Sequence, residues 1–349
     1  MFEFFFRKKI TLSQEQLNEK YNDKSELPKM IRLDACTLCQ LKCPECYAQK
    51  AIAKRNNALG KGYLKFENFK NLIDDNEQLE EIELSNAGEI FLNPELVQII
   101  KYAHEKGVKL TANNGVNLNY LSDEQAEALV KYSFEALTVS IDGASSETYK
   151  IYRVGGDYNK VLENLKKIIN LKKQYKSIYP FLTWKFVVFG HNEHEIPKVK
   201  EIAKEIGVDE LIFDGNYEKK YSPIKNVDFV KKETGLKRPE INSDFAVRIK
   251  EFREGNANWY ECAMLWTPQI NWNGDILGCC SNYRKAFDGN VFRDGLLNAL
   301  NNPHLIYAKN MVMNKAKKKW GIVCSGCWLY KLMKKHNEWI PSQKKKDNL

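Results

Sequence analysis

The sequence lacks several features that would assign it to a familiar class. No run approaches the ~20 apolar residues that a membrane helix needs. The apolar start MFEFFFRKKI is too short for a signal sequence, and its basic residues follow the apolar run instead of preceding it. There is no internal repeat and no nucleic-acid module with interleaved aromatic residues. We therefore expect a cytoplasmic protein with neither a membrane nor a nucleic-acid partner.

Cysteine is missing from the whole interval between Cys46 and Cys262. The nine cysteines form two groups instead, one at 36–46 and one at 262–327. An odd number of thiols in a reducing compartment argues against a disulfide framework. The clustering predicts two separate metal sites, or one site accompanied by spectator thiols.

The net charge of +9 comes largely from lysines between 315 and 346. A basic tail can bind phosphate-rich partners. The simpler interpretation is a solvated end in a lysine-rich chain. A non-catalytic metal-binding adaptor that uses this tail is the alternative from another functional class.

Short β-like runs alternate with amphipathic helical stretches from about 28 to 215. Ser122 is a predicted N-cap, and the stretch PELVQIIKYAHEKG has proline at its start and glycine at its end, as helices often do. The alternation predicts an α/β fold with a parallel sheet and outer helices. Six units fall short of the eight of a closed barrel, so we expect a partial (β/α)6 TIM-like barrel. The six β-like runs lie at 31–34, 82–84, 109–112, 137–141, 183–189 and 210–213.

The rest of the chain divides by composition. A polar stretch with two prolines is typical of a linker, and we expect one helix in it. The second cysteine group follows in a turn-rich region. A small region with so many thiols is expected to draw stability from metal. The predicted parts are an N-terminal segment at 1–28, the barrel at 29–215, a linker at 216–258, a small cysteine-rich domain at 259–335 and a basic tail at 336–349.

The first cysteine group, CQLKCPEC at 39–46, directly follows the first predicted strand. It therefore occupies a loop at the end of the barrel where ligands bind. Structural zinc sites use four protein ligands, usually from two Cys-x2-Cys knuckles. The Cys-x3-Cys-x2-Cys spacing of Cys39, Cys43 and Cys46 instead suits three corners of an iron–sulfur cubane with one open iron. We expect Cys36 to be a buried strand residue, and zinc on all four thiols is the alternative.

Three further segments resemble the radical S-adenosylmethionine (SAM) superfamily together with this array. They are LSNAGEIFLNPEL at 84–96, LTANNG at 110–115 and VSIDGASSETYKIYRVGGDYNKVLENL at 139–165. Each one follows a predicted strand, and the resemblance covers about 30–215. It implies a 4Fe–4S cluster on Cys39, Cys43 and Cys46, with SAM at the open iron. Its chemistry is reductive cleavage of SAM to a 5′-deoxyadenosyl radical, which takes a hydrogen atom from substrate.

The resemblance also implies residues that bind SAM. Glu89 is expected to accept hydrogen bonds from the SAM ammonium, and Arg153 to reach its carboxylate. Ser140 and Asp142 are expected near the ribose and the methionine part. Asn114 belongs to the turn after the third strand and completes this set.

The sequence departs from the family pattern at two positions. Glu45 stands where the family usually has an aromatic residue near adenine, and Tyr47 follows the third cysteine, so the adenine contacts stay open. Ala87 replaces a glycine. His191 and His194, beyond the fifth strand, suit either a proton relay or a solvated loop.

The second cysteine group has the spacing Cys-x11-Gly-x4-Cys, followed by an adjacent cysteine and a final Cys-x2-Cys. A zinc ribbon is one interpretation. Downstream of a radical SAM core, the group resembles the SPASM or twitch auxiliary-cluster domains. Cys280 is the expected spare thiol, although Cys279 and Cys280 can exchange roles. A second, auxiliary 4Fe–4S cluster with full cysteine ligation would act as a redox relay. The expected ligands are Cys262, Cys279, Cys324 and Cys327.

The substrate is less defined. We expect oxidation (dehydrogenation) or epimerisation of a small molecule such as a sugar or cyclitol. The alternative is modification of a ribosomally made peptide or protein, by thioether, carbon–carbon or epimer formation. About 28 residues precede the first strand, which disfavours a leader-binding domain. Sulfatase maturation usually needs two auxiliary clusters, for which thiols are lacking. A reducing partner such as flavodoxin or ferredoxin is expected.

Overall fold

A single mixed sheet organises the part of the chain that the structure describes. This computed structural model describes residues 24–53, 57–215, 221–236, 263–279, 285–337 and 339–340. Its eight described strands follow the spatial order β6-β5-β4-β3-β2-β1-β7-β8. The strands are β1 Met30–Leu33, β2 Glu81–Glu83, β3 Lys109–Val116, β4 Ala136–Ser140, β5 Phe181–Val188, β6 Glu210–Gly215, β7 Gln269–Ile270 and β8 Ile276–Gly278.

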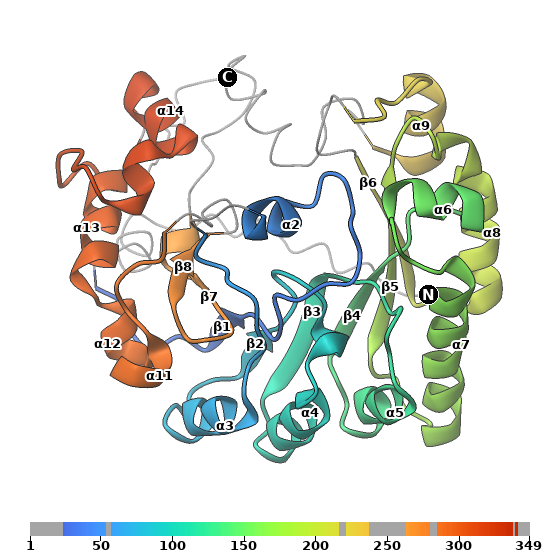
Figure 1. Ribbon diagram of the computed structural model, residues 1–349, viewed down its shortest axis with the longest axis horizontal. Coiled ribbons are helices and arrows are strands. Elements are labelled where there is room, and N and C mark those ends of the chain that lie inside the picture. Colours follow the sequence, from blue (N-terminus) through green and yellow to red (C-terminus); the bar gives the residue numbers. More distant parts are fainter. Residues whose placement is uncertain are drawn as a thin grey trace, which may run out of the picture.

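Strands β1 to β6 are parallel and pair in chain order, as the alternating β/α pattern predicts. Each one falls on a predicted β-like run to within a few residues. Figure 1 shows the helices that follow these strands arranged around the outside of the curved sheet. The fold class of a partial TIM-like barrel is thereby confirmed. The loops after the strands gather at one open end, where this fold binds ligands.

The sheet continues beyond the predicted six strands. Strand β7 pairs in parallel with β1, where Leu33 stands opposite Ile270, and β8 then returns antiparallel to β7. The backbone N–H of Asp34 donates to the carbonyl of Ile270 at 2.9 Å. The cysteine-rich region is therefore joined to the barrel by main-chain hydrogen bonds at the edge of β1.

The helices of the barrel begin and end with ordinary capping chemistry. The side chain of the predicted N-cap Ser122 accepts a hydrogen bond from the backbone N–H of Gln125. The Gln125 side chain in turn accepts one from the backbone N–H of Ser122, which completes a capping box. Gly207 ends α8 in the left-handed conformation that favours glycine. The helices are α2 Tyr47–Ile52, α3 Phe66–Asp74, α4 Leu96–Glu105, α5 Asp123–Lys131, α6 Ser146–Tyr152, α7 Tyr158–Tyr175 and α8 Ile196–Ile206, with 3-10 turns η1 Ile90–Leu92 and η2 Glu193–Glu195.

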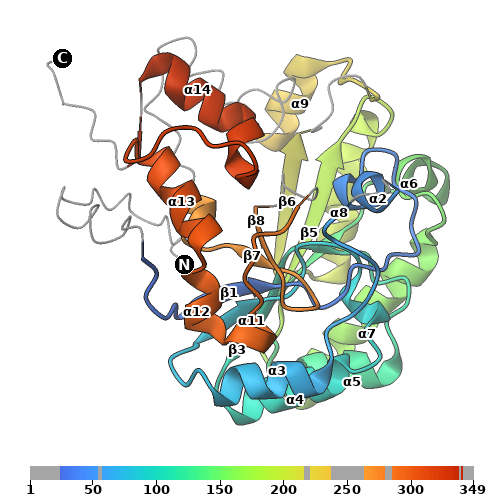
Figure 2. The same ribbon diagram turned by 60° about the vertical axis from the view of Figure 1, so that its left-hand side comes forward.

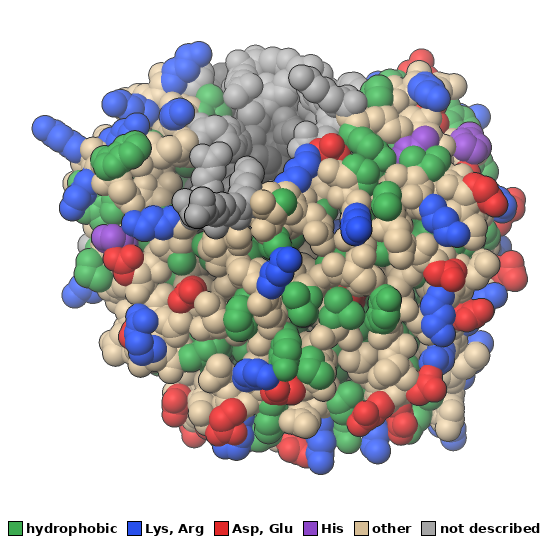
Figure 3. Space-filling model, viewed as in Figure 1, with side chains coloured by type: hydrophobic (Ala, Val, Ile, Leu, Met, Phe, Trp, Pro, Cys, Tyr) green, Lys and Arg blue, Asp and Glu red, His purple; other side chains and the backbone are tan. Residues whose placement is uncertain are grey.

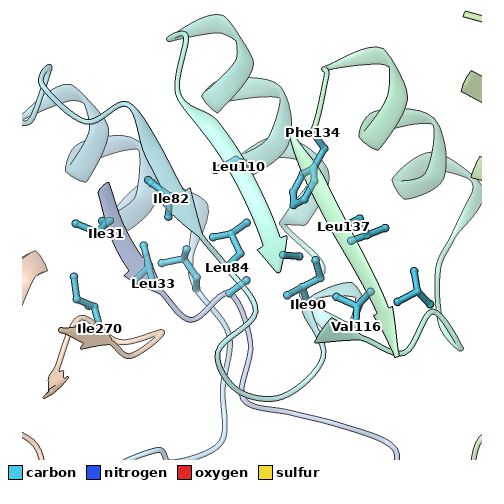
Figure 4. Packing of buried hydrophobic residues seen from close by; sticks show 14 of the residues in the cluster. Ile31, Leu33, Ile82, Leu84, Ile90, Leu110, Val116, Phe134, Leu137 and Ile270 are labelled. Carbon is cyan, nitrogen blue, oxygen red and sulfur yellow. The ribbon is translucent and has the colours of Figure 1, made fainter. Parts of the chain in front are cut away.

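The main core lies between the sheet and these helices. Leu33, Ile82 and Leu137 are completely buried on the strand faces that look outward to the helices. Figure 4 shows these side chains in one layer with Leu110 and with Ile270 of β7. Burying a side chain of this size contributes about 1.5–3 kcal/mol. Because strand side chains alternate, the same strands turn their other residues toward the inside of the barrel.

The C-terminal part forms a compact helical stack beside β1 and β7, visible on the left of Figures 1 and 2. Before it, α9 (Val227–Thr234) lies within the predicted linker. The rest of that linker, most of the N-terminal segment and the tail from 341 lie outside the described residues. No described helix is long and apolar enough to span a bilayer. The stack comprises η3 Ala263–Leu265, α11 Val291–Asp294, α12 Leu296–Leu300, α13 Pro303–Val312, η4 Val323–Gly326 and α14 Trp328–His336.

Candidate active site

The first cysteine group occupies the loop between β1 and α2, at the open end of the barrel. The main chain ties this loop to its surroundings, because Lys42 N–H donates to Val154 at 2.9 Å and Glu89 N–H donates to Leu38 at 2.8 Å. Burial raises the pKa of Cys39 to about 12, and the nearby Glu89, Cys43 and Cys46 add to the shift. The three thiols therefore lie close enough to influence one another, and metal binding must release their protons.

Cys36 has a different environment. It is completely buried and forms an isolated antiparallel bridge with Tyr63. Its pKa is raised to about 12 by burial first, with Glu89 and Asp34 as the nearby charges. Gly88 has φ +68°, and a Cβ there would come within 2.3 Å of the Cys36 carbonyl oxygen. The Cys36 backbone thus supports the segment that carries Glu89, and exclusion of its thiol from the cluster stays a prediction.

Among the described residues, no three His, Cys, Asp or Glu side chains gather tightly enough to ligate a single metal ion.

Glu89 is almost completely buried between the cysteine loop and the end of β3. One carboxylate oxygen accepts from the backbone of Asn117 at 2.6 Å and the other from Phe91 at 3.4 Å. Burial raises the pKa of Glu89 to about 7. Asn117 also donates its side-chain amide to the Cys39 sulfur at 3.8 Å. Sequence reasoning missed Asn117, although a polar run directly after a strand could have indicated it.

Arg153 and Asp142 form an ion pair beside Cys43. The Nε of Arg153 lies 2.5 Å from the Asp142 carboxylate, whose other oxygen accepts from the backbone of Val187 at 2.8 Å. A terminal guanidinium nitrogen donates to the Cys43 sulfur at 3.9 Å. Burial opposes the charge of Arg153, but Asp142 and Cys43 outweigh it and raise its pKa. Asp142 is fully buried with both oxygens engaged, so it fixes Arg153 in place.

Ser140 and Asn114 lie at neighbouring strand ends. A Cβ on Gly115 would stand 2.5 Å from the Ser140 hydroxyl, so glycine is needed for the close approach of β3 and β4. The side chain of Asn114 donates to Asn86 at 3.2 Å, and the Asn114 carbonyl accepts from Lys185 at 2.8 Å.

Lys185 pairs in register with Ser140 and faces the interior of the barrel. Its pKa is lowered, first by burial and then by the positive charge of Arg153. Sequence reasoning missed Lys185. A lysine inside the apolar strand pattern TWKFVVF, on the face opposite the tryptophan, was the available signal.

Aromatic rings cluster next to the cysteine loop. Tyr152 lies 4.5 Å from Phe189 and 5.7 Å from Tyr221 between ring centroids. His191 stacks on Phe189 at 5.1 Å, bonds through Nδ1 to Ser222 at 2.7 Å, and has its pKa lowered by burial.

The other predicted residues of this region are His194, Tyr47 and Glu45. His194 lies exposed on η2. The hydroxyl of Tyr47 donates to the carbonyl of Asn86, and Glu45 pairs with Lys50.

The second cysteine group is described in part. Cys279 follows β8, Cys324 lies in η4, and Cys327 is the N-cap of α14. All three are partly buried. Cys262 and Cys280 lie outside the described residues, so the choice between Cys279 and Cys280 stays a prediction.

Comparisons with known proteins agree with this geometry. The family model of the radical SAM superfamily matches residues 35–208. An AdoMet-dependent heme synthase from Methanosarcina barkeri is 27% identical over 183 residues, which are 52% of this chain and 48% of the relative. A GTP 3′,8-cyclase from Alkaliphilus oremlandii is 24% identical over 184 residues, 51% of this chain and 53% of that protein. The chain thus spans about half the length of these curated relatives.

Solved structures share the fold over most of the chain. SuiB from Streptococcus suis superposes with a TM-score of 0.60 at 15% identity, covering 94% of this chain and 79% of that one. SuiB bound to its precursor peptide SuiA gives 0.59 at 14% identity, covering 91% and 73%. The enzyme anSMEcpe with bound AdoMet gives 0.52 at 16% identity, covering 86% and 89%.

A partial parallel barrel with a three-thiol loop at its open end defines a SAM-dependent enzyme that works with an iron–sulfur cluster. The chain belongs to the radical SAM superfamily. This confirms the resemblance drawn from its four motifs, and it makes the protein an enzyme, not a metal-binding adaptor. The fold binds a 4Fe–4S cluster and SAM.

Proposed function

We propose that this enzyme cleaves SAM reductively beside Cys39, Cys43 and Cys46 and removes a hydrogen atom from a polar small molecule. One observation supports the proposal. These thiols lie close to the buried Glu89 and to the Arg153 guanidinium at one end of the barrel. Soft thiolates suit iron–sulfur clusters. When bound and reduced, the cluster supplies the electron that breaks the SAM sulfonium into methionine and a 5′-deoxyadenosyl radical.

The protein groups around the loop suit the charges of SAM. Glu89 offers a carboxylate for the ammonium, and the Arg153 guanidinium offers a cation for the carboxylate. Asp142 acts through Arg153, because both of its oxygens are already engaged. Ser140 and Asn114, at the ends of neighbouring strands, would contact the ribose and the methionine part. A charged hydrogen bond of this kind contributes about 1.5–3 kcal/mol.

The adenine contacts are assigned by proximity. Tyr221 has its pKa raised by burial and then by the charges of Glu45 and Cys43, which indicates a place beside the cysteine loop. We assign adenine stacking to Tyr152 and Tyr221 in place of the aromatic residue that Glu45 replaces. Tyr47, bonded to the Asn86 carbonyl, would border the same site.

The inner face of the barrel favours a polar substrate. Glu83 accepts hydrogen bonds from Thr111 at 2.8 Å and from the Ser85 hydroxyl at 2.6 Å, and Thr183 bonds Glu210 at 3.1 Å. Hydroxyl, amide and charged groups therefore replace the branched apolar residues that usually fill such barrels. Lys185 has a lowered pKa and faces this space, so we assign it a contact with a hydroxyl or anionic group of the substrate.

A peptide substrate is the second candidate, because the solved structure of SuiB with the peptide SuiA shares this fold. Either substrate would be oxidised or epimerised through the same radical. We further assign a second cluster to Cys262, Cys279, Cys324 and Cys327, as a redox relay with full thiolate ligation. Fully loaded protein should then hold about eight irons per chain. Joint replacement of Cys279 and Cys280 by alanine should lower this to about four.

The experiment is anaerobic reconstitution with iron and sulfide, followed by dithionite and SAM. We expect 5′-deoxyadenosine from the native chain and none from Cys43→Ala. Absence of the product from protein with about eight irons would contradict the proposed chemistry. Candidate sugars, cyclitols and peptides, each deuterated, then compete for transfer of deuterium into 5′-deoxyadenosine. If deuterium enters 5′-deoxyadenosine only from a peptide, the substrate is a peptide and not a small molecule.

A further inference from the structure

From α12 to α14, the C-terminal helical stack carries positive charge without any compensating acid. Residues 295–337 contain eight lysines and no aspartate or glutamate. One, Lys309, is completely buried, and the others are exposed. Figure 3 shows Lys and Arg side chains spread over the region of α13 and α14. Within the described chain, none of the exposed ones forms an ion pair. These exposed lysines, with Trp320, are called the basic face: Lys315, Lys317, Lys318, Lys319, Lys331, Lys334 and Lys335.

An exposed tryptophan follows three of these lysines in the chain. Trp320 is 93% exposed, in the loop between α13 and η4. This loop is anchored, because the Tyr307 hydroxyl donates to the Lys317 carbonyl at 3.0 Å. The Lys319 ammonium also lies 5.2 Å from the centroid of the Tyr307 ring. Exposed tryptophans surrounded by polar residues are typical anchors of protein interfaces.

The basic face adjoins the second cysteine group. Trp320 precedes η4, which contains Cys324, and Cys327 is the N-cap of the helix that carries Lys331 and Lys334. Backbone bonds from Ser325 to Ile322 at 2.9 Å and from Cys327 to Cys324 at 3.0 Å make this segment compact. A partner seated on the basic face would therefore lie against the loop that presents these thiols.

We propose that the basic face docks a small acidic one-electron carrier protein of the flavodoxin or ferredoxin type. The inference rests on the proposed auxiliary cluster, which gives a carrier a reason to approach at this point. Charge complementarity steers such encounters, and a central aromatic anchor holds them in place. A single tryptophan offers no platform of stacked aromatic residues for nucleic-acid bases.

The test measures how tightly a purified, negatively charged flavodoxin binds to the reconstituted full chain. Quenching of tryptophan fluorescence and calorimetry are the two readouts of binding. The variant K317E/K318E/K319E reverses the centre of the basic face. Its matched control is K160E/K166E/K173E, an equal change of charge on exposed lysines of α7. We expect flavodoxin binding to weaken about tenfold or more in the first variant and to change less than about twofold in the control. The native complex should weaken steeply with salt, and the reversed variant should lose most of that dependence.

Trp320→Ala provides an independent arm if the triple variant folds poorly, as judged by circular dichroism. We expect about tenfold weaker flavodoxin binding with unchanged thermal unfolding. Equal weakening in the basic-face and α7 variants would overturn the proposal. So would tighter binding of a short DNA duplex or of anionic lipid vesicles than of flavodoxin.

Dithionite separates this inference from the proposed function. Dithionite-driven formation of 5′-deoxyadenosine should be the same in all variants, because a small reductant needs no docking surface. Normal dithionite activity combined with no flavodoxin binding by the native chain would contradict the docking proposal alone. Loss of dithionite activity in the native chain would contradict the proposed function.

Discussion

The outer and inner faces of the parallel sheet belong to the same strands but carry opposite chemistry. On the outer face, apolar side chains pack against the helices, as Ile82, Leu137 and Trp184 do. On the inner face, Glu83 and Lys185 form polar contacts with a loop and a neighbouring strand, and Ser140 lies close against Gly115. The outer face therefore determines stability and the inner face determines chemistry, so substitutions one residue apart should have separable effects.

The largest effect on activity is expected from the three thiols at the open end of the barrel. Cys43→Ala should reduce formation of 5′-deoxyadenosine to background, because it removes one of the three thiols that we propose as ligands of the SAM-binding cluster. Cys36, which was expected on the first strand, lies beyond β1 in an isolated bridge. Cys36→Ala removes this buried sulfur and should cost about 1 kcal/mol of stability with activity retained. Iron content and product assays on both variants check this. Loss of activity in Cys36→Ala with full stability would make Cys36 a ligand.

The outer face should give the largest loss of stability. Leu137→Ala creates a cavity at a fully buried position and should lower the free energy of unfolding by about 2–5 kcal/mol. Thr138→Val, one residue along on the inner face, should change it by less than about 1 kcal/mol. Urea titrations of the two variants measure the difference. Equal losses would show that the faces are not separable in energy.

Glu89→Gln should act on SAM binding more than on the fold. The neutral amide keeps the shape but loses the charge offered to the ammonium, so SAM affinity should fall about tenfold to a hundredfold. Calorimetry with SAM on reconstituted protein measures this, with the exposed Glu124→Gln on α5 as control. Unchanged affinity would remove Glu89 from the SAM site.

A pH-dependent effect concerns Asp34, an inner-face carboxyl at the junction of β1 and β7. It accepts from Gln269 at 2.8 Å and from the backbone of Ala87 at 2.9 Å, and burial raises its pKa to about 7. A buried acid with a raised pKa contributes stability that is fully present below its ordinary pKa of 3.8 and is lost as pH rises toward about 7. Asp34→Asn should remove this decline, which is at most about 1.4 kcal/mol per pH unit.

Urea titrations between pH 4 and 8 compare the native chain with Asp34→Asn. The amide of Gln269 can turn to accept from the new asparagine, since its oxygen has no partner among the described residues. The variant should therefore fold normally. The same pH dependence in both proteins would assign the decline to other groups.

Sequence reasoning anticipated the barrel because its strands and helices alternate with clear periods and caps. It anticipated the candidate site because each motif follows a strand, and parallel strands bring their ends together. It did not anticipate that β7 joins the sheet, since the two residues Gln269 and Ile270 carry no periodic signal. Nor did it anticipate that Val187 and Arg153 occupy both oxygens of Asp142, because such contacts depend on three-dimensional packing.

The pairing of β1 with β7 also affects how the chain can fold during synthesis. Leu33 lies near the start of the barrel, yet its partner Ile270 emerges from the ribosome only after all six barrel strands. Until then, β1 presents an unpaired edge that other chains could join. Such long-range pairing is slow because the intervening loop must close first. The nascent barrel is therefore expected to need chaperone protection until the cysteine-rich region arrives to cover its edge.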